Sequence, residues 1–227
     1  MLNLVLVEAA LETVPRSIIR HPSVRRNAKR RGKKPEETLL DRSLHHAAMR
    51  GLVNSHKRGR PDIVHFCLLE ALGAPLNREG MLRLFVHTYG GYKIEVSPEA
   101  RLPRDYTRFC GLMEQLFAER RVPPGAEEPL LELDSLSLRD LMGQICASRV
   151  TALTSRGHST TLEETCRRLA RDETPAVFIG AFPSGPMGEG ILSLSNEALS
   201  IYPEPLDAWI VTSRLIYEFE RAHQLLL

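Results

Sequence analysis

The stretch from Ala176 to Tyr217 constrains the fold of this chain more than any other. It opens with the apolar run AVFIGAF, which stops at Pro183 and predicts a buried strand followed by a glycine-rich loop. A second strand is expected to end at SIYPEP, because prolines cannot donate hydrogen bonds within a central ladder. The segment LDAWIVTSRLIYEFE then repeats its apolar residues at helical spacing. Two strand ends, each followed by small residues, predict a ligand crevice in an α/β sheet.

The glycine-rich loop resembles a phosphate-binding loop in spacing but not in chemistry. Gly180 and Gly185 are separated by the four residues that such a loop requires. The next residues are Pro186 and Met187, whereas a nucleotide site needs Lys and then Ser or Thr at these positions. This difference excludes a P-loop. A neutral ligand pocket and ordinary strand-to-helix turns both remain open.

The whole chain has the composition of one globular α/β domain. It has 227 residues, of which 43% are hydrophobic and 26% charged, and its formal net charge is +2. Its four cysteines lie far apart and form no CxxC pair, so we expect no metal site, no disulfide scaffold and a reducing compartment. The opening run LNLVLVEA predicts a buried strand that is too short for a membrane span.

The most basic segment of the chain lies between Arg16 and Lys34. It holds nine arginines and lysines and no acidic residue. A solvated loop is the simplest interpretation of a charge run, but a run of this density without counter-charge favours contact with phosphate. Few aromatic residues interrupt it, so we expect it to contact a nucleic-acid backbone and not to stack on bases.

Local signals predict the remaining elements in order. A helix is expected to begin at Pro35 and to carry His45 and His46, which point about 100° apart and therefore pack or join polar networks without chelating a metal. Further helices are expected from Pro61 and from near Pro103. The other predicted elements are a β-hairpin over about 82–97, a strand and short helix over about 130–145, and a strand, loop and helix from about 149, with Thr160 or Thr161 as N-cap.

Two groups of arginines are candidates for RNA contacts. Asp62 lies two residues after Arg60 and could hold its guanidinium in a fixed orientation, although an acidic residue there could also cap only its own helix. Arg104 and Arg108 are expected to share one helix face, with Arg101 nearby and Tyr106 beside them. Such a patch suits single-stranded RNA, and an ordinary amphipathic helix is the alternative.

Six long strings in the chain resemble one family. They are GAFPSGPMGEG, LSIYPEPLDAWIVTSRLIYEFE, LLDRSLHHAAM, RGRPDIVH, RLPRDYTRF and TSRGHSTTLEE. All are similar to the Nep/Emg family of ribosome-biogenesis methyltransferases, which belongs to the SPOUT superfamily. The resemblance implies an α/β fold with a SPOUT-type sheet, a C-terminal deep trefoil knot and a small β-hairpin/helix elaboration. It also implies a single SPOUT domain over residues 1–227, with inserted basic and hairpin segments at about 16–34 and 82–97.

The same resemblance implies S-adenosyl-L-methionine as cofactor, bound in the loops of the knot. Carried over position by position, the family's cofactor loops fall at the end of the strand TALTSRG, on the glycine-rich loop and on the run that ends at Pro203. The expected cofactor-binding residues are Leu153, Thr154, Gly180, Gly185, Ala198, Leu199, Ser200, Ile201, Tyr202 and Pro203.

The implied reaction is methyl transfer to N1 of a pseudouridine in small-subunit rRNA. The family carry-over makes Arg60 and Asp62 the candidate catalytic residues, without an identifiable general base, and Arg60, Arg101, Arg104 and Arg108 the RNA-binding residues. A non-catalytic rRNA-binding assembly factor and a SPOUT methyltransferase acting on tRNA remain alternatives.

The resemblance further implies a homodimer, small-subunit rRNA as partner, and ribosomal proteins or assembly factors as further candidate partners. The chain opens directly on its first strand, as archaeal members do, so we expect a cytoplasmic protein with no membrane partner. The last helix offers a candidate dimer face, which core packing would explain equally well, in Trp209, Ile210, Leu215, Ile216 and Phe219.

Overall fold

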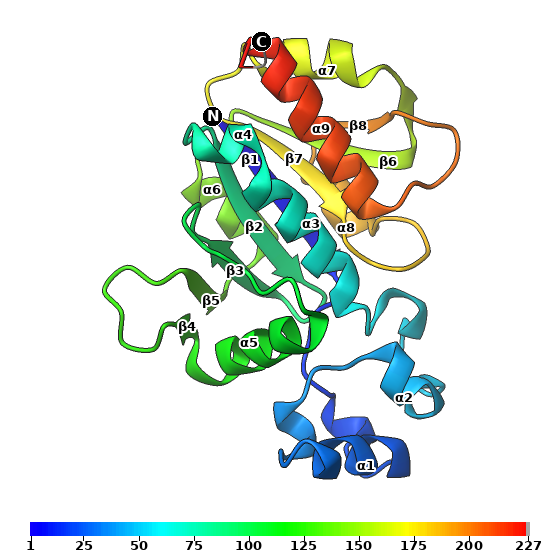
Figure 1. Ribbon diagram of the computed structural model, residues 1–227. Coiled ribbons are helices and arrows are strands. Elements are labelled where there is room, and N and C mark those ends of the chain that lie inside the picture. Colours follow the sequence, from blue (N-terminus) through cyan, green and yellow to red (C-terminus); the bar gives the residue numbers. More distant parts are fainter. Residues whose placement is uncertain (226–227) are drawn as a thin grey trace.

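The computed structural model describes residues 1–225 and is built on one mixed sheet (Figure 1). Within these residues the sheet has eight strands in the order β4-β5-β3-β2-β1-β7-β6-β8. The five strands from β2 to β8 along this order are parallel, and β3, β5 and β4 continue the sheet in antiparallel pairs. The strands are β1 (Leu2–Ala9), β2 (Leu82–Thr88), β3 (Tyr92–Val96), β4 (Arg121–Val122), β5 (Leu131–Ser135), β6 (Arg149–Ser159), β7 (Pro175–Gly180) and β8 (Glu197–Ser200).

Helices cover both faces of the sheet. The helices are α1 (Pro22–Arg30), α2 (Arg42–Met49), α3 (Pro61–Gly73), α4 (Pro75–Arg78), α5 (Tyr106–Glu119), α6 (Leu138–Gln144), α7 (Leu162–Leu169), α8 (Glu189–Leu192) and α9 (Ala208–Ala222). Strand β1 lies in the middle and is buried on both sides. Its Leu4 and Leu6 pack with α3, α5, α7 and α9, whereas Val5 and Val7 pack with α6 and the residues around α8. The alternation of side chains along a strand therefore joins two apolar layers.

The part of the chain that connects β1 to α3 forms a smaller lobe, which lies at the lower end of the view in Figure 1. We call residues 14–52 the basic lobe; it holds the 3-10 turns η1 (Arg16–Ile18) and η2 (Pro35–Glu37) and the helices α1 and α2. Most of its buried apolar side chains form a cluster of their own, which consists of Val14, Ile18, Val24, Leu40, Ala48 and Met49, whereas Leu39 packs in the main core. The lobe therefore has a separate small core beside the main sheet.

Most predicted elements are confirmed, including β1, the helix from Pro61, the β2–β3 hairpin and the N-cap at Thr161. Strand β2 pairs directly with β1, so the hairpin extends the main sheet and is not a separate attachment. Helix α1, which lies inside the basic segment, and the short elements α4, α8 and β4 were not predicted.

Two predicted helix starts were wrong. Pro35 begins only the turn η2, and α2 starts at Arg42 behind Asp41, whose carboxylate accepts from the Ser43 N–H at 2.8 Å. The intervening Leu39 and Leu40 are extended and buried, because Leu39 bridges to Thr13 and the Leu40 N–H donates to the Glu12 carbonyl. Helix α5 likewise begins at Tyr106, with Asp105 as its N-cap. Arg104 therefore precedes the helix and does not share a helix face with Arg108.

Candidate functional site

A pocket lies where three parallel strands end, and its volume is about 270 Å³. Leu153 and Thr154 line it where β6 parts from β7, and Gly180 lines it at the end of β7. Beyond β8 the chain contributes Ile201 and Tyr202. The crevice expected at the edge of an α/β sheet is therefore present, and its volume lies just below the range of about 300–1,000 Å³ that is typical of ligand sites.

Six of the ten residues predicted to bind a cofactor line this pocket. They are Leu153, Thr154, Gly180, Gly185, Ile201 and Tyr202. The other four, Ala198, Leu199, Ser200 and Pro203, are not part of its wall. Leu199 and Ser200 are buried in the pairing of β8 with β6, and the Ser200 hydroxyl donates to the Tyr202 carbonyl at 2.8 Å. These two residues therefore affect the pocket indirectly, through the conformation of the loop that follows β8.

The walls of the pocket suit a neutral or cationic ligand. Its apolar surface includes Ile179, Phe182, Leu206 and Val211, none of which the sequence analysis singled out. Among its lining residues in the described chain, Glu204 is the only charged one, so the pocket presents no cation to a phosphate. Gly185 has φ of +97°, a backbone conformation that a side chain would strain, and its missing Cβ leaves room for the ring of His56. Hydroxyls and backbone groups therefore provide the polar contacts.

The regular pairing of β6 is interrupted over residues 154–157, which form a loop beside the pocket. This β6 loop encloses β8. Leu199 pairs with Leu153 at the start of this loop and with His158 at its end. Gly157 lies inside the enclosure, where a Cβ would come within 2.5 Å of the backbone of Ala198 and Leu199. Only glycine allows the two backbones to approach this closely.

Glu8 ties the glycine-rich loop to the segment that leads to Arg60. It ends the regular part of β1 with φ of +48°, which is uncommon for a residue with a side chain. Its carboxylate accepts from the Lys57 ammonium at 2.7 Å and from the Gly188 N–H at 2.9 Å. Lys57 is buried, and its ammonium lies 4.5 Å from the ring centroid of Phe182 in the pocket wall. The pocket loop is therefore held from outside by a partly buried ion pair.

Arg60 and Asp62 form the pair that the sequence predicts. The guanidinium donates to the carboxylate through Nε and Nη2, each at 2.7 Å, which fixes its plane. The bond to Asp62 raises the pKa of Arg60, burial opposes this, and the negative charges of Asp62 and Asp207 add to the rise. The Arg60 side chain is still 36% exposed, so its free edge can contact a ligand.

Arg101, Arg104 and Arg108 are all exposed at the start of α5, and none of them forms an ion pair within residues 1–225. The buried His65 of α3 holds their segment, because its Nε2 lies 2.7 Å from the Pro103 carbonyl and its ring stacks on Phe109. Tyr106 was expected to lie beside these arginines, but it is not part of their exposed surface. Its hydroxyl donates to Asp41 at 2.6 Å, and burial, followed by this bond, raises its pKa.

A family profile described as "EMG1/NEP1 methyltransferase" matches residues 4–220. The chain belongs to this family. It is 45% identical over 225 residues to the ribosomal RNA small subunit methyltransferase Nep1 of Staphylothermus marinus, covering 99% of this chain and 97% of the relative. The Nep1 of Thermococcus onnurineus is 44% identical, with 97% and 98% of the two chains covered.

A solved structure of the same family shares the fold. It is the crystal structure of Archaeoglobus fulgidus Nep1 bound to S-adenosylhomocysteine, with a TM-score of 0.86, 42% identity, and 97% and 98% of the two chains covered. In residues 1–225, no group of three or more His, Cys, Asp or Glu side chains is arranged to hold a metal ion. No helix in that range is long and apolar enough to cross a membrane.

Proposed function

We propose that this methyltransferase transfers a methyl group from S-adenosyl-L-methionine to N1 of a pseudouridine in small-subunit rRNA. The membership of nearly the whole chain in the EMG1/NEP1 methyltransferase family carries the assignment. The names of the archaeal relatives support small-subunit rRNA as the substrate, and the S-adenosylhomocysteine complex of the Archaeoglobus protein supports the cofactor. The choice of pseudouridine N1 is the finer part of the proposal.

The pocket fits the cofactor. Its apolar walls suit an adenine ring, while Thr154, Ser155 and Ser184 offer hydroxyls at its edge. Glu204 adds one negative charge, which complements a cationic sulfonium. We assign cofactor contacts to the lining residues Leu153, Thr154, Gly180, Gly185, Ile201 and Tyr202. When bound, S-adenosylmethionine supplies an already electrophilic methyl group.

Arg60 is the proposed catalytic residue of the chain. Transfer of the N1 proton to solvent water leaves negative charge on the base, and a guanidinium held in a fixed orientation stabilises that charge without having to reorganise. Asp62 provides the orientation through its two-point bond, so we assign it a positioning role. Alignment of the base with the methyl donor supplies a further part of the rate.

Arg101, Arg104 and Arg108 are proposed to bind the rRNA strand that carries the target. They are exposed and lie on the segment that His65 anchors to α3. RNA presented from an unpaired loop would allow the base to be turned into the site.

The enclosure of Leu199 by the β6 loop supports a deep trefoil knot, and we propose that residues 1–227 form one knotted SPOUT domain. A homodimer is proposed as the working form. Leu215, Ile216 and Phe219 are buried in the core, so only Trp209 and the exposed Ile210 of the predicted dimer face remain available. The exposed Phe66 packs on Trp209, with ring centroids 5.4 Å apart, and extends this apolar area. We place the enzyme in the cytoplasm, with its rRNA substrate and other assembly factors.

Nucleoside analysis of rRNA tests the function. Mass spectrometry of small-subunit rRNA from cells with and without this chain should show methylpseudouridine only when the chain is present. Unchanged rRNA together with a changed tRNA nucleoside would favour a tRNA methyltransferase. Absence of S-adenosylmethionine binding by calorimetry would favour the non-catalytic assembly factor.

A further inference from the structure

Helix α1 has a continuous basic face. Its buried side consists of Val24, Asn27 and Ala28, and the four remaining positions after its first turn are exposed. All four are cationic: Arg25, Arg26, Lys29 and Arg30. None of them forms an ion pair in the described part of the chain. Four solvated charges of one sign on two helical turns make a concentrated positive surface, which attracts a polyanionic partner.

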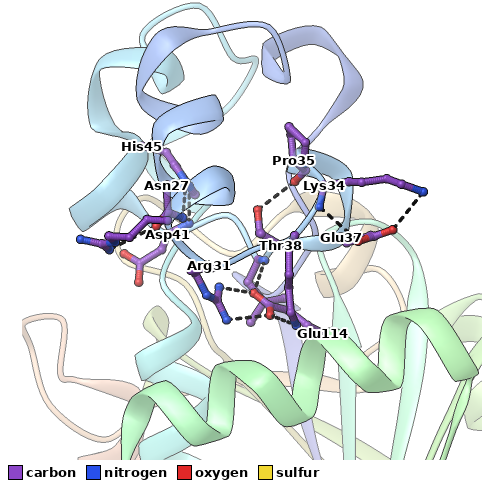
Figure 2. Close-up of polar contacts among 12 residues, drawn as sticks. Asn27, Arg31, Lys34, Pro35, Glu37, Thr38, Asp41, His45 and Glu114 are labelled. Carbon is purple, nitrogen blue, oxygen red and sulfur yellow. Dashed lines mark hydrogen bonds and ion pairs between the residues drawn. The ribbon is translucent and has the colours of Figure 1, made fainter.

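The other end of the basic segment is bound by Glu114 of α5 (Figure 2). The Glu114 side chain is 1% exposed and accepts from Arg31 at 2.5 and 2.7 Å and from Lys33 at 2.7 Å. It also accepts from the Leu39 N–H at 3.0 Å. One buried carboxylate therefore binds the residues on both sides of η2.

This contact determines how the basic lobe is oriented on α5. Buried ion pairs contribute little net stability but strongly disfavour arrangements in which one partner is left alone. A second tie lies eight residues earlier on the same helix, where Tyr106 donates to Asp41 of the lobe. Eight residues span about two helical turns, or roughly 12 Å. Two polar contacts at this separation fix the direction of the lobe as well as its position.

We propose that the exposed face of α1 binds the phosphate backbone of the RNA that flanks the target nucleotide, and that Glu114 is the positioning residue that orients this face relative to Arg104 and Arg108. The proposal rests on the proposed rRNA methyltransferase function. Helix α1 has no aromatic residue, so it offers charges for phosphates and no surface for base stacking. A paired stem beside the target loop presents such a backbone.

Two RNAs separate this surface from the target site. One is a short single strand that carries a pseudouridine, and the other presents the same strand as the loop of a hairpin with a long stem. We expect Arg25→Gln/Arg26→Gln/Lys29→Gln to bind the hairpin about tenfold more weakly at moderate salt and to lower its salt slope by about 2, because up to three phosphate contacts are lost. Affinity for the single strand should stay unchanged.

A matched control removes the same number of charges elsewhere. Arg78, Arg139 and Arg171 are exposed and form no ion pair within residues 1–225. The variant Arg78→Gln/Arg139→Gln/Arg171→Gln should bind both RNAs like the parent protein. Equal losses on both RNAs, or none, for the α1 variant would overturn the proposal. A parent protein that bound neither RNA would also refute the rRNA function itself.

The role of Glu114 needs a variant that keeps the fold. Glu114→Gln should weaken hairpin binding about tenfold while the single strand and S-adenosylmethionine bind as before, since about one phosphate contact or more is lost when the lobe shifts. Glu114→Asp retains the charge and should lie between this variant and the parent. If both variants remain folded by thermal unfolding and bind the hairpin like the parent, Glu114 does not orient the surface. Loss of cofactor binding as well would mean general damage and would equally contradict the positioning role.

Discussion

At the scale of single residues, the pocket depends on a glycine that has no Cβ. A Cβ on Gly180 would lie 2.6 Å from the ring of Phe182, a residue of the pocket wall. Phe182 in turn rests on the Lys57 ammonium, which Glu8 holds. A methyl group at position 180 would therefore displace the Phe182 ring, which is itself packed on the Lys57 ammonium.

Gly180→Ala should weaken S-adenosylmethionine binding about tenfold, because the displaced ring intrudes on a well-packed pocket and overpacking costs about 1–3 kcal/mol. Calorimetric titration measures this effect. Gly190→Ala is the matched control, since nothing lies within 4 Å of its added methyl group. Equal affinities of the two variants would show that Phe182 yields without cost.

Arg60→Ala should lower the rate of methyl transfer by about 10²–10³, the usual loss when one preorganised electrostatic donor is removed. Asp62→Asn should lose less, because the guanidinium remains but is no longer held by a carboxylate. Single-turnover assays with enzyme in excess over RNA report the chemical step. Both variants should retain the cofactor affinity of the parent, and a parallel loss of that affinity would place Arg60 in the donor site.

At the scale of elements, the contact between the β6 loop and β8 leaves the least room for added atoms. Gly157 faces the backbone of Ala198 and Leu199, which has no rotamer to change. Gly157→Ala should destabilise the fold by about 3 kcal/mol, the upper part of the range for overpacking. Urea unfolding gives this value. Gly143→Ala in α6 has open space around it and should be stabilising by about 0.5–1 kcal/mol, as expected within a helix.

The elements show where local signals are sufficient. Strand β1, helix α3 and the β2–β3 hairpin follow from periodicity and turn residues, and each appears where it is predicted. The start of α2 was mistaken because Pro35 and Asp41 both signal a helix start. The choice between them is made by distant residues: Leu39 bridges to Thr13 and its N–H donates to Glu114.

The candidate site also has a part that local sequence signals predict and a part that they do not. Its loops could be predicted, since glycines and prolines mark strand ends locally, and the family resemblance supplied the arginines as candidates. The support behind the loops could not be predicted. Glu8 and Gly188 are 180 positions apart, and their contact depends on a left-handed backbone at Glu8 that no sequence pattern indicates.

At the scale of the whole molecule, two buried histidines in different parts of the structure link stability to pH. Burial lowers the pKa of His45, which accepts from the Asp41 N–H in the basic lobe, and of His87, which contacts the Leu136 carbonyl in the sheet. The unfolded chain takes up these protons at about pH 6.5, before the folded protein does. More protons are then bound in the unfolded state, so stability falls as pH decreases below that value.

The expected loss is up to about 1.4 kcal/mol per pH unit for each histidine, between about pH 6.5 and the lower folded values. Urea unfolding at a series of pH values measures it. His87→Gln should flatten the dependence, because one of the two buried imidazoles is then absent. Stability that is constant through this window would contradict the prediction.

The central place of β1 has a consequence for synthesis of the chain. The first strand to be translated pairs with β2 on one side, but its other partner is β7, where Asn3 meets Ala176. One edge of an almost completely buried strand therefore stays open until most of the polypeptide has been made. The nascent chain must keep this edge from pairing with other molecules in the meantime. Release of a truncated product that ends before β7 would thus yield an aggregation-prone species and not a smaller folded domain.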